Sequence, residues 1–592
     1  MYKQAILIFS LIIYSLVGTS QETTEWTIDS SITPMFVDFS SDDRYVILDS
    51  EKGYEVWNTE TKSKVLEGKY RNKFSRNIPG VYLSEGSAYL LFENEEIFLQ
   101  IDYTLNHTKV DAFDLTTGDK IWSIDNLDMQ ISQVEAIFQI VDNAKRVTTS
   151  EVRRHRSFQE PLNRAGITVT RESHSRNLAA NLIGHDETIN KLINYLPEEN
   201  AIAVSGKESL QLLDLKTGKI LWEQPELKGA MGEILYEPSK DILIAVRIHH
   251  GEFAQFKGNP EVQALNAKTG ELIWATKYSG HFTPNLAFVY DEILILPYYG
   301  LMFLDINTGE ELEGEVKDGM QRQLRMYRNM AALSSSTEGL GSNCSYPILD
   351  ENGIIHYVVG LGNGVHINPD GNRKAYLQID PKQSKIISKE EEIARVGHLI
   401  IQEILTDDFM YLKLTRGLSN TYILGLDRKT GKVAFETDKL KNRLGSGYDP
   451  FLLNDDRIID VSTKGVHIYN ARTGEEIKTI SYKNIGVGKF RNQVVFNQGF
   501  ILLGTKGVAF IDNYGEVKNK FENIGRIRNL VINDNEIWLL EKKRLIRMST
   551  NPISLISEVS FKRNEELFFS ETGSTSAKLN TDNNQIFIIK AK

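Results

Sequence analysis

The side chains best suited to chemistry in this 592-residue chain are few and lie far apart. Cys344 is the single cysteine, so neither an intramolecular disulfide nor a cysteine-based zinc site can form. His249 and His250 are adjacent, and because neighbours on a strand point to opposite faces, they do not suit one metal ion. No HExxH motif of zinc enzymes occurs. We therefore predict no metal site.

Glycine-rich segments do not complete a ligand site either. GLGNG at 360–364 is followed by a strand–turn–strand pattern, whereas phosphate binding needs a helix N-terminus there. GVGK at 486–489 lacks the remainder of a P-loop, and DINTG at 305–309 lacks the later bidentate carboxylate of a calcium loop. With no nucleophile elbow or convincing carboxylate pair, the sequence predicts no catalytic, cofactor-binding or metal-binding residues.

A cluster of arginines in residues 151–185 is the strongest candidate for binding. Loops on a rigid scaffold often carry binding function, and this segment is positive in an acidic protein. Its candidate partner-binding residues are Arg153, Arg154, Arg156, Arg164 and Arg171. A solvated loop without a partner is the alternative. A second segment, 316–330, alternates methionine or leucine with arginine; we interpret it as a packed linker, with an amphipathic lid or partner helix as the alternative.

The net charge argues against nucleic acid as a partner, and the N-terminus indicates an exported protein. The net charge of −11 gives no general attraction to nucleic acid or anionic lipid. Lys3, an apolar run over 5–17 and the small residues Gly18 and Ser20 predict a signal peptide over 1–20, cleaved before Gln21. The run is too short for a membrane span of about 20 residues. We expect a periplasmic or secreted protein without a membrane span.

A short repeat organises most of the chain. Its clearest copies are AFDLTTGDKIW at 112–122, LLDLKTGKILW at 212–222 and ALNAKTGELIW at 264–274. Asp or Asn starts a turn by binding the following backbone amides, and glycine supplies the positive φ that closes it, so each copy predicts a β-hairpin. Weaker copies begin at 303, 425 and 468 and degenerate ones at 56 and 510, and most spacings fit a four-stranded blade of about 40–50 residues.

The pattern A-x-D-x-x-T-G-x-x-x-W resembles the tryptophan-docking motif of propeller repeats of the pyrroloquinoline-quinone (PQQ) type. Residues 112–122 match every fixed position. The resemblance implies an all-β fold of four-stranded β-propeller blades, in which each tryptophan packs between neighbouring blades. The resemblance implies that four residues dock the blades and are structural: Trp122, Trp222, Trp274 and Phe435.

The number of repeats sets the expected domain organisation. The spacing suggests about eleven or twelve blades, whereas one propeller usually has about 4–8. We therefore expect two tandem propellers over 21–315 and 346–592, joined by a linker or insertion over 316–345 that breaks the strand pattern. One large ring with long insertions is the alternative.

The resemblance brings an enzyme hypothesis that this sequence does not favour. PQQ-dependent dehydrogenases hold a cofactor and calcium on the propeller axis, and many carry a disulfide between adjacent cysteines, which a single cysteine excludes. We prefer a scaffold without enzymatic activity or cofactor that binds a protein or glycan and is similar in fold to propeller proteins that assist outer-membrane assembly. A PQQ-dependent dehydrogenase or other propeller enzyme, and a spacer without any partner, remain alternatives.

Overall fold

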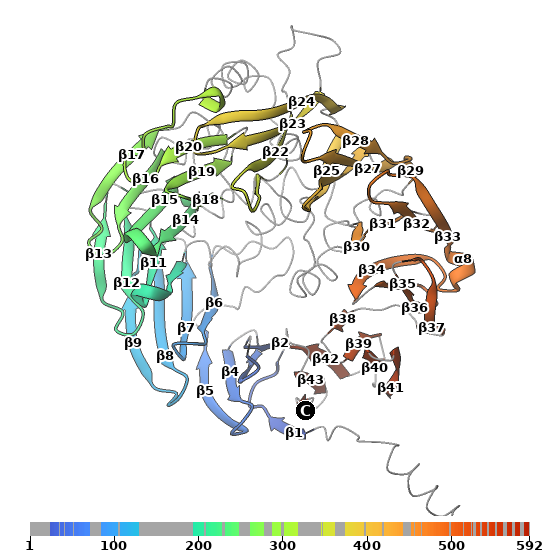
Figure 1. Ribbon diagram of the computed structural model, residues 1–592. Helices are drawn as coiled ribbons and strands as arrows, with labels where there is room; N and C mark the ends of the chain where they lie inside the picture. The colour runs from blue at the N-terminus through green and yellow to red at the C-terminus, as the bar shows by residue number, and fades with distance from the viewer. Residues whose placement is uncertain are drawn as a thin grey trace, which may run out of the picture.

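The chain passes once around a single ring of β-sheets in the computed structural model (Figure 1). The colour changes from blue to red along the ring, so neighbouring sheets follow one another in the sequence. The structure describes residues between Thr24 and Lys590. Besides both ends of the chain and short stretches in loops, the intervals that it leaves out are 71–84, 129–192, 248–260, 278–286, 318–344, 361–372 and 442–450.

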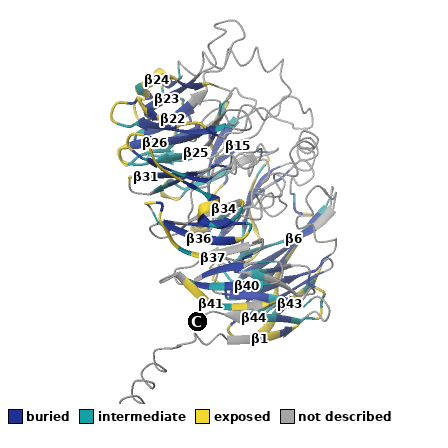
Figure 2. Ribbon diagram, turned by 90° about the vertical axis from the view of Figure 1, so that its right-hand side faces the viewer, coloured by how far each residue is buried: buried dark blue, intermediate teal, exposed yellow. Residues whose placement is uncertain are grey.

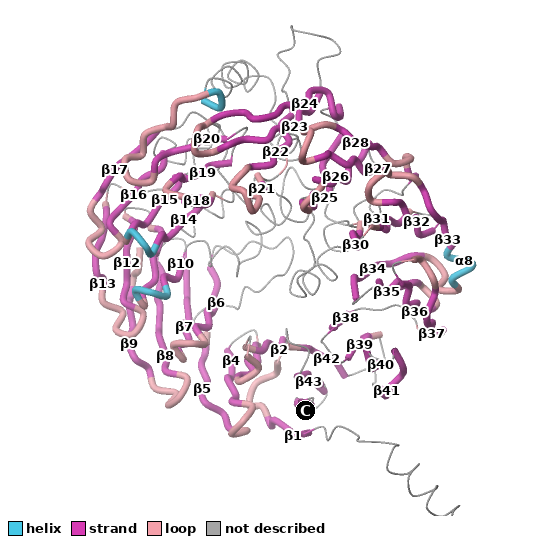
Figure 3. The backbone as a smooth tube through the Cα atoms, viewed as in Figure 1, coloured by secondary structure: helices cyan, strands magenta, loops and turns pink. Residues whose placement is uncertain are grey.

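Each blade is an antiparallel meander whose first strand lies innermost (Figures 1 and 3). Blade 1 holds β2 (Phe36–Phe39), β3 (Tyr45–Asp49), β4 (Gly53–Asn58) and β5 (Ser63–Lys69). Blade 2 holds β6 (Glu85–Phe92), β7 (Ile97–Thr104), β8 (His107–Asp114) and β9 (Lys120–Asp125). Blade 3 holds β10 (Ile193–Leu196), β11 (Ala201–Ser205), β12 (Leu210–Asp214) and β13 (Ile220–Gln224). Blade 4 holds β14 (Met231–Glu237), β15 (Ile242–Arg247), β16 (Glu261–Asn266) and β17 (Leu272–Lys277). Blade 5 holds β18 (Phe288–Tyr290), β19 (Ile293–Pro297) and β20 (Leu301–Asp305), and an isolated bridge from Leu304 to Glu311 marks its outer edge.

The remaining blades follow the same plan. Blade 6 holds β21 (Ile348–Leu349), β22 (Ile355–Gly360), β23 (Arg373–Asp380) and β24 (Lys385–Arg395). Blade 7 holds β25 (His398–Leu405), β26 (Phe409–Arg416), β27 (Asn420–Asp427) and β28 (Val433–Glu436), and β29 (Leu440–Lys441) also pairs with β27. Blade 8 holds β30 (Leu452–Asn454), β31 (Arg457–Val461), β32 (Gly465–Asn470) and β33 (Glu476–Ser481), and the short helix α8 (Tyr482–Ile485) follows it. Blade 9 holds β34 (Phe490–Phe496), β35 (Gly499–Gly504), β36 (Gly507–Asp512) and β37 (Val517–Glu522). Blade 10 holds β38 (Asn529–Ile532), β39 (Glu536–Leu540), β40 (Arg544–Thr550) and β41 (Ile553–Ser560).

Both ends of the described chain build blade 11. Its inner strands β42 (Glu565–Phe569), β43 (Thr575–Asn580) and β44 (Gln585–Lys590) come from the C-terminus, and its outer strand β1 (Thr24–Asp29) comes from the N-terminus. β1 pairs with β44 from Thr24↔Lys590 to Asp29↔Gln585. A core that includes Ile28, Val46 and Ile588 joins this blade to blade 1. The seam between the two ends is therefore both hydrogen-bonded and packed.

The expected division into two tandem propellers is not confirmed. The described sheets number eleven and form one ring, and the sheets on either side of the expected linker share a core. Phe303 of blade 5 and Tyr357 of blade 6 both belong to that core. Two propellers were predicted because a single propeller usually has no more than about eight blades. The alternative of one ring with long insertions agrees with the structure.

Burial on both faces of the middle strands explains how the blades pack. Middle strands such as β3 and β4 are buried on both faces because each blade packs between two others, whereas the outer strand β9 is mostly exposed (Figure 2). A register shift interrupts the pairing of the third and fourth strands at the same place in blades 1 to 4, just before the repeat's Asp or Asn. Such a bulge increases local twist, and it precedes the repeat turn.

The two ends of the blades differ in the length of their connections. We call the end that carries the connections of first to second and third to fourth strands the turn face; the other end is the loop face. Within the described blades, no connection that joins a first to a second strand or a third to a fourth strand exceeds five residues. Every longer connection joins strand ends at the loop face, as between β9 and β10, except the one after β20, which leaves Asp305 at the turn face and reaches β21 at the loop face. Connections at the turn face are thus short within each blade, and most longer connections start and end at the loop face.

Candidate functional site

The repeat turns connect neighbouring blades through their tryptophans. Trp122 Nε1 donates a hydrogen bond to the Leu215 carbonyl oxygen at 2.8 Å. Trp222 donates in the same way to Ala267 and Trp274 to Ile306, each at 2.7 Å. Each acceptor is the residue after the Asp or Asn of the next blade's repeat. All three indole rings are buried.

The repeat glycine of the next blade lies directly against each indole. A Cβ atom at Gly218 would lie 2.5 Å from the Trp122 ring, and one at Gly270 would lie 2.6 Å from the Trp222 ring. Both glycines also have positive φ, at 67° and 73°. Glycine therefore serves both the turn and the close approach of the ring.

Phe435 occupies the corresponding place on β28, but it cannot donate a hydrogen bond. Its ring lies against Gly474, where a Cβ atom would be 2.3 Å away. The acceptor on the next blade, the Ala471 carbonyl oxygen, instead receives a hydrogen bond from Tyr411 Oη at 3.2 Å. The blade-docking role of the four aromatic residues stays a prediction, because packing alone does not measure what each ring contributes to stability.

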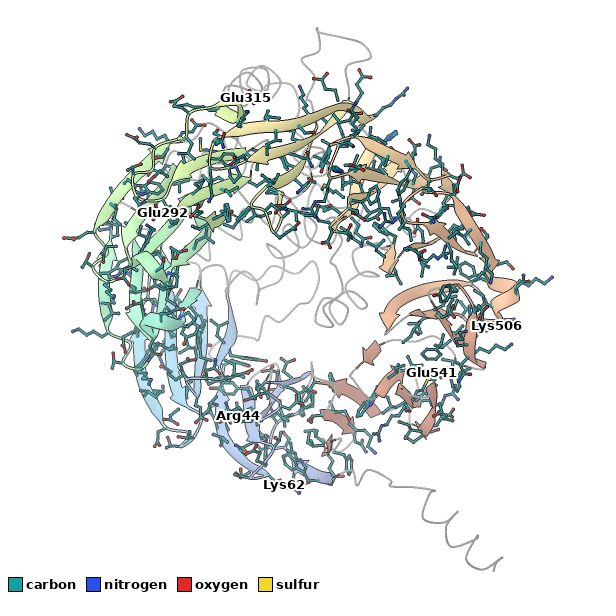
Figure 4. All side chains as sticks on the ribbon, viewed as in Figure 1. Arg44, Lys62, Glu292, Glu315, Lys506 and Glu541 are labelled. Atoms are coloured by element: carbon teal, nitrogen blue, oxygen red, sulfur yellow. The ribbon has the colours of Figure 1, made fainter. Side chains whose placement is uncertain are left out.

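Acidic turns between the first and second strands form a second repeated feature, which the sequence analysis missed. Pairs such as Asp42–Asp43, Glu95–Glu96, Asp291–Glu292, Asp350–Glu351 and Asp407–Asp408 fall in these turns. Some of their residues adopt positive φ, among them Asp43 at 59° and Glu96 at 54°. Figure 4 labels Arg44 and Glu292, which lie in two of these turns. In the sequence, each of these turns appears as two adjacent acids, or a similar polar pair, just before a short aliphatic run.

These acids bind bases carried by neighbouring blades. Arg44 Nη1 lies 2.7 Å from Glu96 Oε1, and Arg472 Nη2 lies 2.8 Å from Asp408 Oδ2. Lys382 pairs with Asp291 across the boundary between blades 5 and 6. Arg472 stands two residues after Asn470 of the repeat, and Lys382 stands two residues after Asp380, which begins the equivalent turn of blade 6. The variable positions of the repeat turn thus carry contacts between blades on the turn face.

One of these contacts is buried and branches into a network. Arg428 pairs with Asp350 and donates from Nη1 to the Thr406 carbonyl oxygen at 2.6 Å. Asp350 Oδ2 lies 3.0 Å from His356 Nε2, and His356 Nδ1 lies 2.6 Å from Tyr376 Oη. The Asp350, His356 and Arg428 side chains are at most 8% exposed. This network ties blade 6 to blade 7.

Burial and hydrogen bonding shift the protonation of this network in a consistent direction. Burial lowers the pKa of His356, and Arg428 lowers it further, although Asp350 opposes both. Burial would raise the pKa of Asp350, but hydrogen bonds from the Ile354 amide, His356 and Arg428 outweigh it, so this pKa is lowered. Burial raises the pKa of Tyr376. The network therefore favours a neutral imidazole beside an ionised carboxylate.

A buried ion pair joins blades 7 and 8. Lys413 Nζ on β26 lies 2.5 Å from Asp460 Oδ1 on β31, and the two side chains are 0% and 1% exposed. On β26, Phe409 and Tyr411 precede Lys413 at every second residue, and both belong to the aromatic core between these blades. The pair thus lies next to an apolar region, where ions are costly unless well paired.

A serine–histidine–glutamate relay lies on blade 8. Ser462 Oγ is 2.9 Å from His467 Nε2, and His467 Nδ1 is 3.1 Å from Glu476 Oε2. Thr479 Oγ1 also reaches Nδ1, at 3.0 Å. A hydroxyl, an imidazole and a carboxylate in this order can activate the hydroxyl as a nucleophile. Ser462 directly follows β31, the second strand of its blade, and so lies at the loop face.

The arginines predicted to bind a partner lie outside the described residues. Arg153, Arg154, Arg156, Arg164 and Arg171 fall between β9 and β10, whose facing ends, at Asp125 and Ile193, both belong to the loop face. The predicted signal peptide, Cys344, His249 and His250, and most of the Met/Arg segment 316–330 also fall outside the described part of the chain. These sequence predictions therefore stay predictions.

The described residues contain neither a candidate metal site nor a helix suited to a membrane span. In these parts of the chain, no group of three or more His, Cys, Asp or Glu side chains is placed to hold a metal ion. None of the helices within the described ranges is long and apolar enough to cross a membrane.

Comparison with known proteins supports the repeat family. Residues 201–335 match the sequence model of the family described as outer membrane protein assembly factor BamB. This match confirms the resemblance to PQQ-type propeller repeats over blades 3 to 5. No curated protein matches the chain.

Several solved structures are similar at low identity. BamB from Moraxella catarrhalis is 16% identical, with 68% of this chain and 94% of that chain covered and a TM-score of 0.29. Apo AztD from Citrobacter koseri is 11% identical, with 61% and 94% covered and a TM-score of 0.26. The dihydro-heme d1 dehydrogenase NirN, in complex with DHE, is 10% identical, with 77% and 78% covered and a TM-score of 0.30. None of these similarities assigns a function to this chain.

Proposed function

We propose that this protein is an exported scaffold that binds a protein partner, or a glycan, on the loop face of its propeller. The observation that carries the proposal is the unequal length of the connections at the two ends of the blades. On the turn face the short connections use their charges to join neighbouring blades, as Arg472 does with Asp408. Most longer connections start and end at strand ends of the loop face, and loops on a rigid scaffold are the usual place for binding residues.

Charge and family support a protein partner. The chain as a whole has a net charge of −11, yet residues 151–185 concentrate arginine between two strand ends of the loop face. Arginine suits interfaces because its planar fork binds carboxylates and stacks on aromatic rings. The matched family is described as an outer membrane protein assembly factor, which makes an extracytoplasmic protein the first partner class to test.

Replacing residues 151–185 by a short Gly/Ser linker tests the part of this segment. We expect the purified intact protein to retain specific partners from an envelope extract and the deletion variant to lose them. A matched variant with residues 248–260 replaced, which also lie between strands on the loop face, should keep the partners. Identical partner sets for the intact protein and the 151–185 variant would overturn the assignment of this segment.

The relay on blade 8 favours a second function, that of a propeller enzyme acting by nucleophilic catalysis. Ser462 would attack an activated ester, His467 would accept its proton and pass it to the leaving alcohol, and water would then release the acyl group. Glu476 would orient the imidazole. The distances of 2.9 and 3.1 Å lie within the hydrogen-bonding reach that such a relay needs.

Labelling with a fluorophosphonate probe distinguishes the relay from a structural turn. A reactive relay should give a labelled band that disappears in the Ser462→Ala variant and remains in Ser87→Ala, which removes another buried serine. No labelling of the intact, folded protein would exclude the nucleophilic role and leave the scaffold function in place.

A further inference from the structure

We propose that Lys413 and Asp460 condense into an intramolecular isopeptide bond that cross-links blades 7 and 8. Lys413 Nζ and Asp460 Oδ1 lie 2.5 Å apart, in direct contact across the boundary between the two blades. The two residues are 47 positions apart in the sequence and lie on the second strands of adjacent blades. A covalent bond here would close a loop through two neighbouring blades.

The environment favours a neutral product over an ion pair. Both side chains are excluded from solvent, at 0% and 1% exposure. Lys413 lies on the same face of β26 as Phe409 and Tyr411, and Asp460 lies on the same face of β31 as Ile458. Phe409, Tyr411 and Ile458 belong to one hydrophobic core. Burying two charges beside such a core carries a desolvation penalty that a neutral amide does not.

The reaction balances without any added reagent. A proton first passes from the Lys413 ammonium to the Asp460 carboxylate, which gives an amine and a carboxylic acid. The amine nitrogen then attacks Cγ of Asp460, the bond from Cγ to the hydroxyl oxygen breaks, and one further Nζ proton leaves with that hydroxyl as water. The ion pair is thereby converted into one amide and one water molecule.

Such a bond would provide a covalent cross-link that the cysteine content does not allow. An exported protein commonly uses disulfides for covalent support, yet the single cysteine, Cys344, allows no intramolecular disulfide. The inference does not depend on the partner or on the blade 8 relay, so it can fail or hold independently of the proposed function.

Peptide mass spectrometry of the intact protein tests the bond directly. Trypsin cannot cleave after an acylated lysine, so the digest should contain residues 396–416 joined to residues 458–464, lighter than the sum of the two peptides by one water. Fragmentation should place the link between Lys413 and Asp460. If trypsin instead cleaves after Lys413 and releases residues 458–464 free, with no joined species, the pair is an ordinary salt bridge and the proposal is wrong.

Two variants control the assignment. Lys413→Arg keeps a cation in the site but cannot condense, so its digest should contain residues 458–464 only as a free peptide. Lys374→Arg alters another fully buried lysine, on β23, and should retain the joined peptide in the same yield as the unaltered protein. Loss of the joined peptide from both variants to the same extent would also contradict the assignment to Lys413.

Discussion

Trp222→Ala is expected to lower the free energy of unfolding by about 3–5 kcal/mol, the range for removing a large buried aromatic residue. The indole is 7% exposed, lies against Gly270 and donates a hydrogen bond to Ala267. Its removal leaves a cavity between blades 3 and 4 and a carbonyl oxygen without its donor. Urea unfolding of the purified protein, followed by circular dichroism, measures the change.

The neighbouring residue provides a matched control. Leu221 precedes Trp222 on the same strand but is 45% exposed, so Leu221→Ala should change the free energy of unfolding by less than about 0.5 kcal/mol. An equal effect of the two substitutions would show that the tryptophan has no special docking role. Trp222→Phe should recover most of the packing but not the hydrogen bond, and so fall between the two.

Arg428→Met is expected to cost about 3–5 kcal/mol, because it leaves the Asp350 carboxylate buried without its main cationic partner. The methionine fills part of the space of the guanidinium stem, so the loss reports on charge rather than on volume. Arg472→Met is the control: this residue makes the equivalent contact with Asp408 one blade further on, but it is 69% exposed. An exposed pair contributes less than about 1 kcal/mol, so comparable losses in the two variants would contradict the prediction.

The same network predicts how stability depends on pH. Because burial lowers the pKa of His356, the unfolded chain binds a proton more readily, and the free energy of unfolding should fall as the pH drops below about 6.5. The lowered pKa of Asp350 adds a further loss below about pH 4. In Arg428→Met both pKa values should move back toward their ordinary ranges, so acid unfolding curves should become shallower. Curves of equal steepness would exclude this network as their source.

The repeat predicted the blades because each fixed residue has a local task. Asp214 accepts hydrogen bonds from the Thr217 amide and hydroxyl, and Gly218 adopts the positive φ that ends the turn. The repeat itself does not specify the closure of the ring, which is expected instead from the need to pair exposed edge strands. It depends on β1 meeting β44, and pairing between residues more than 500 positions apart leaves no local pattern.

The candidate sites show a similar division. The acidic turns were visible in the sequence as a second repeat, and counting them would have located blades whose Asp–Thr–Gly turn is degenerate. The relay of Ser462 and His467 and the pair of Lys413 and Asp460 were not visible, because each joins residues of ordinary type at unremarkable spacing. Only the register of the strands and the packing of one blade on the next bring these atoms together.

The pairing of β1 with β44 makes the chain suitable for circular permutation. Thr24 lies opposite Lys590, so a short peptide could join the two ends, and new termini could be opened in any tight turn between a first and a second strand. In such a circular permutant the break would fall within one blade, and the former ends would become an ordinary hairpin. The ring therefore does not fix the position of the termini, and the chain break could be moved from blade 11 to another blade.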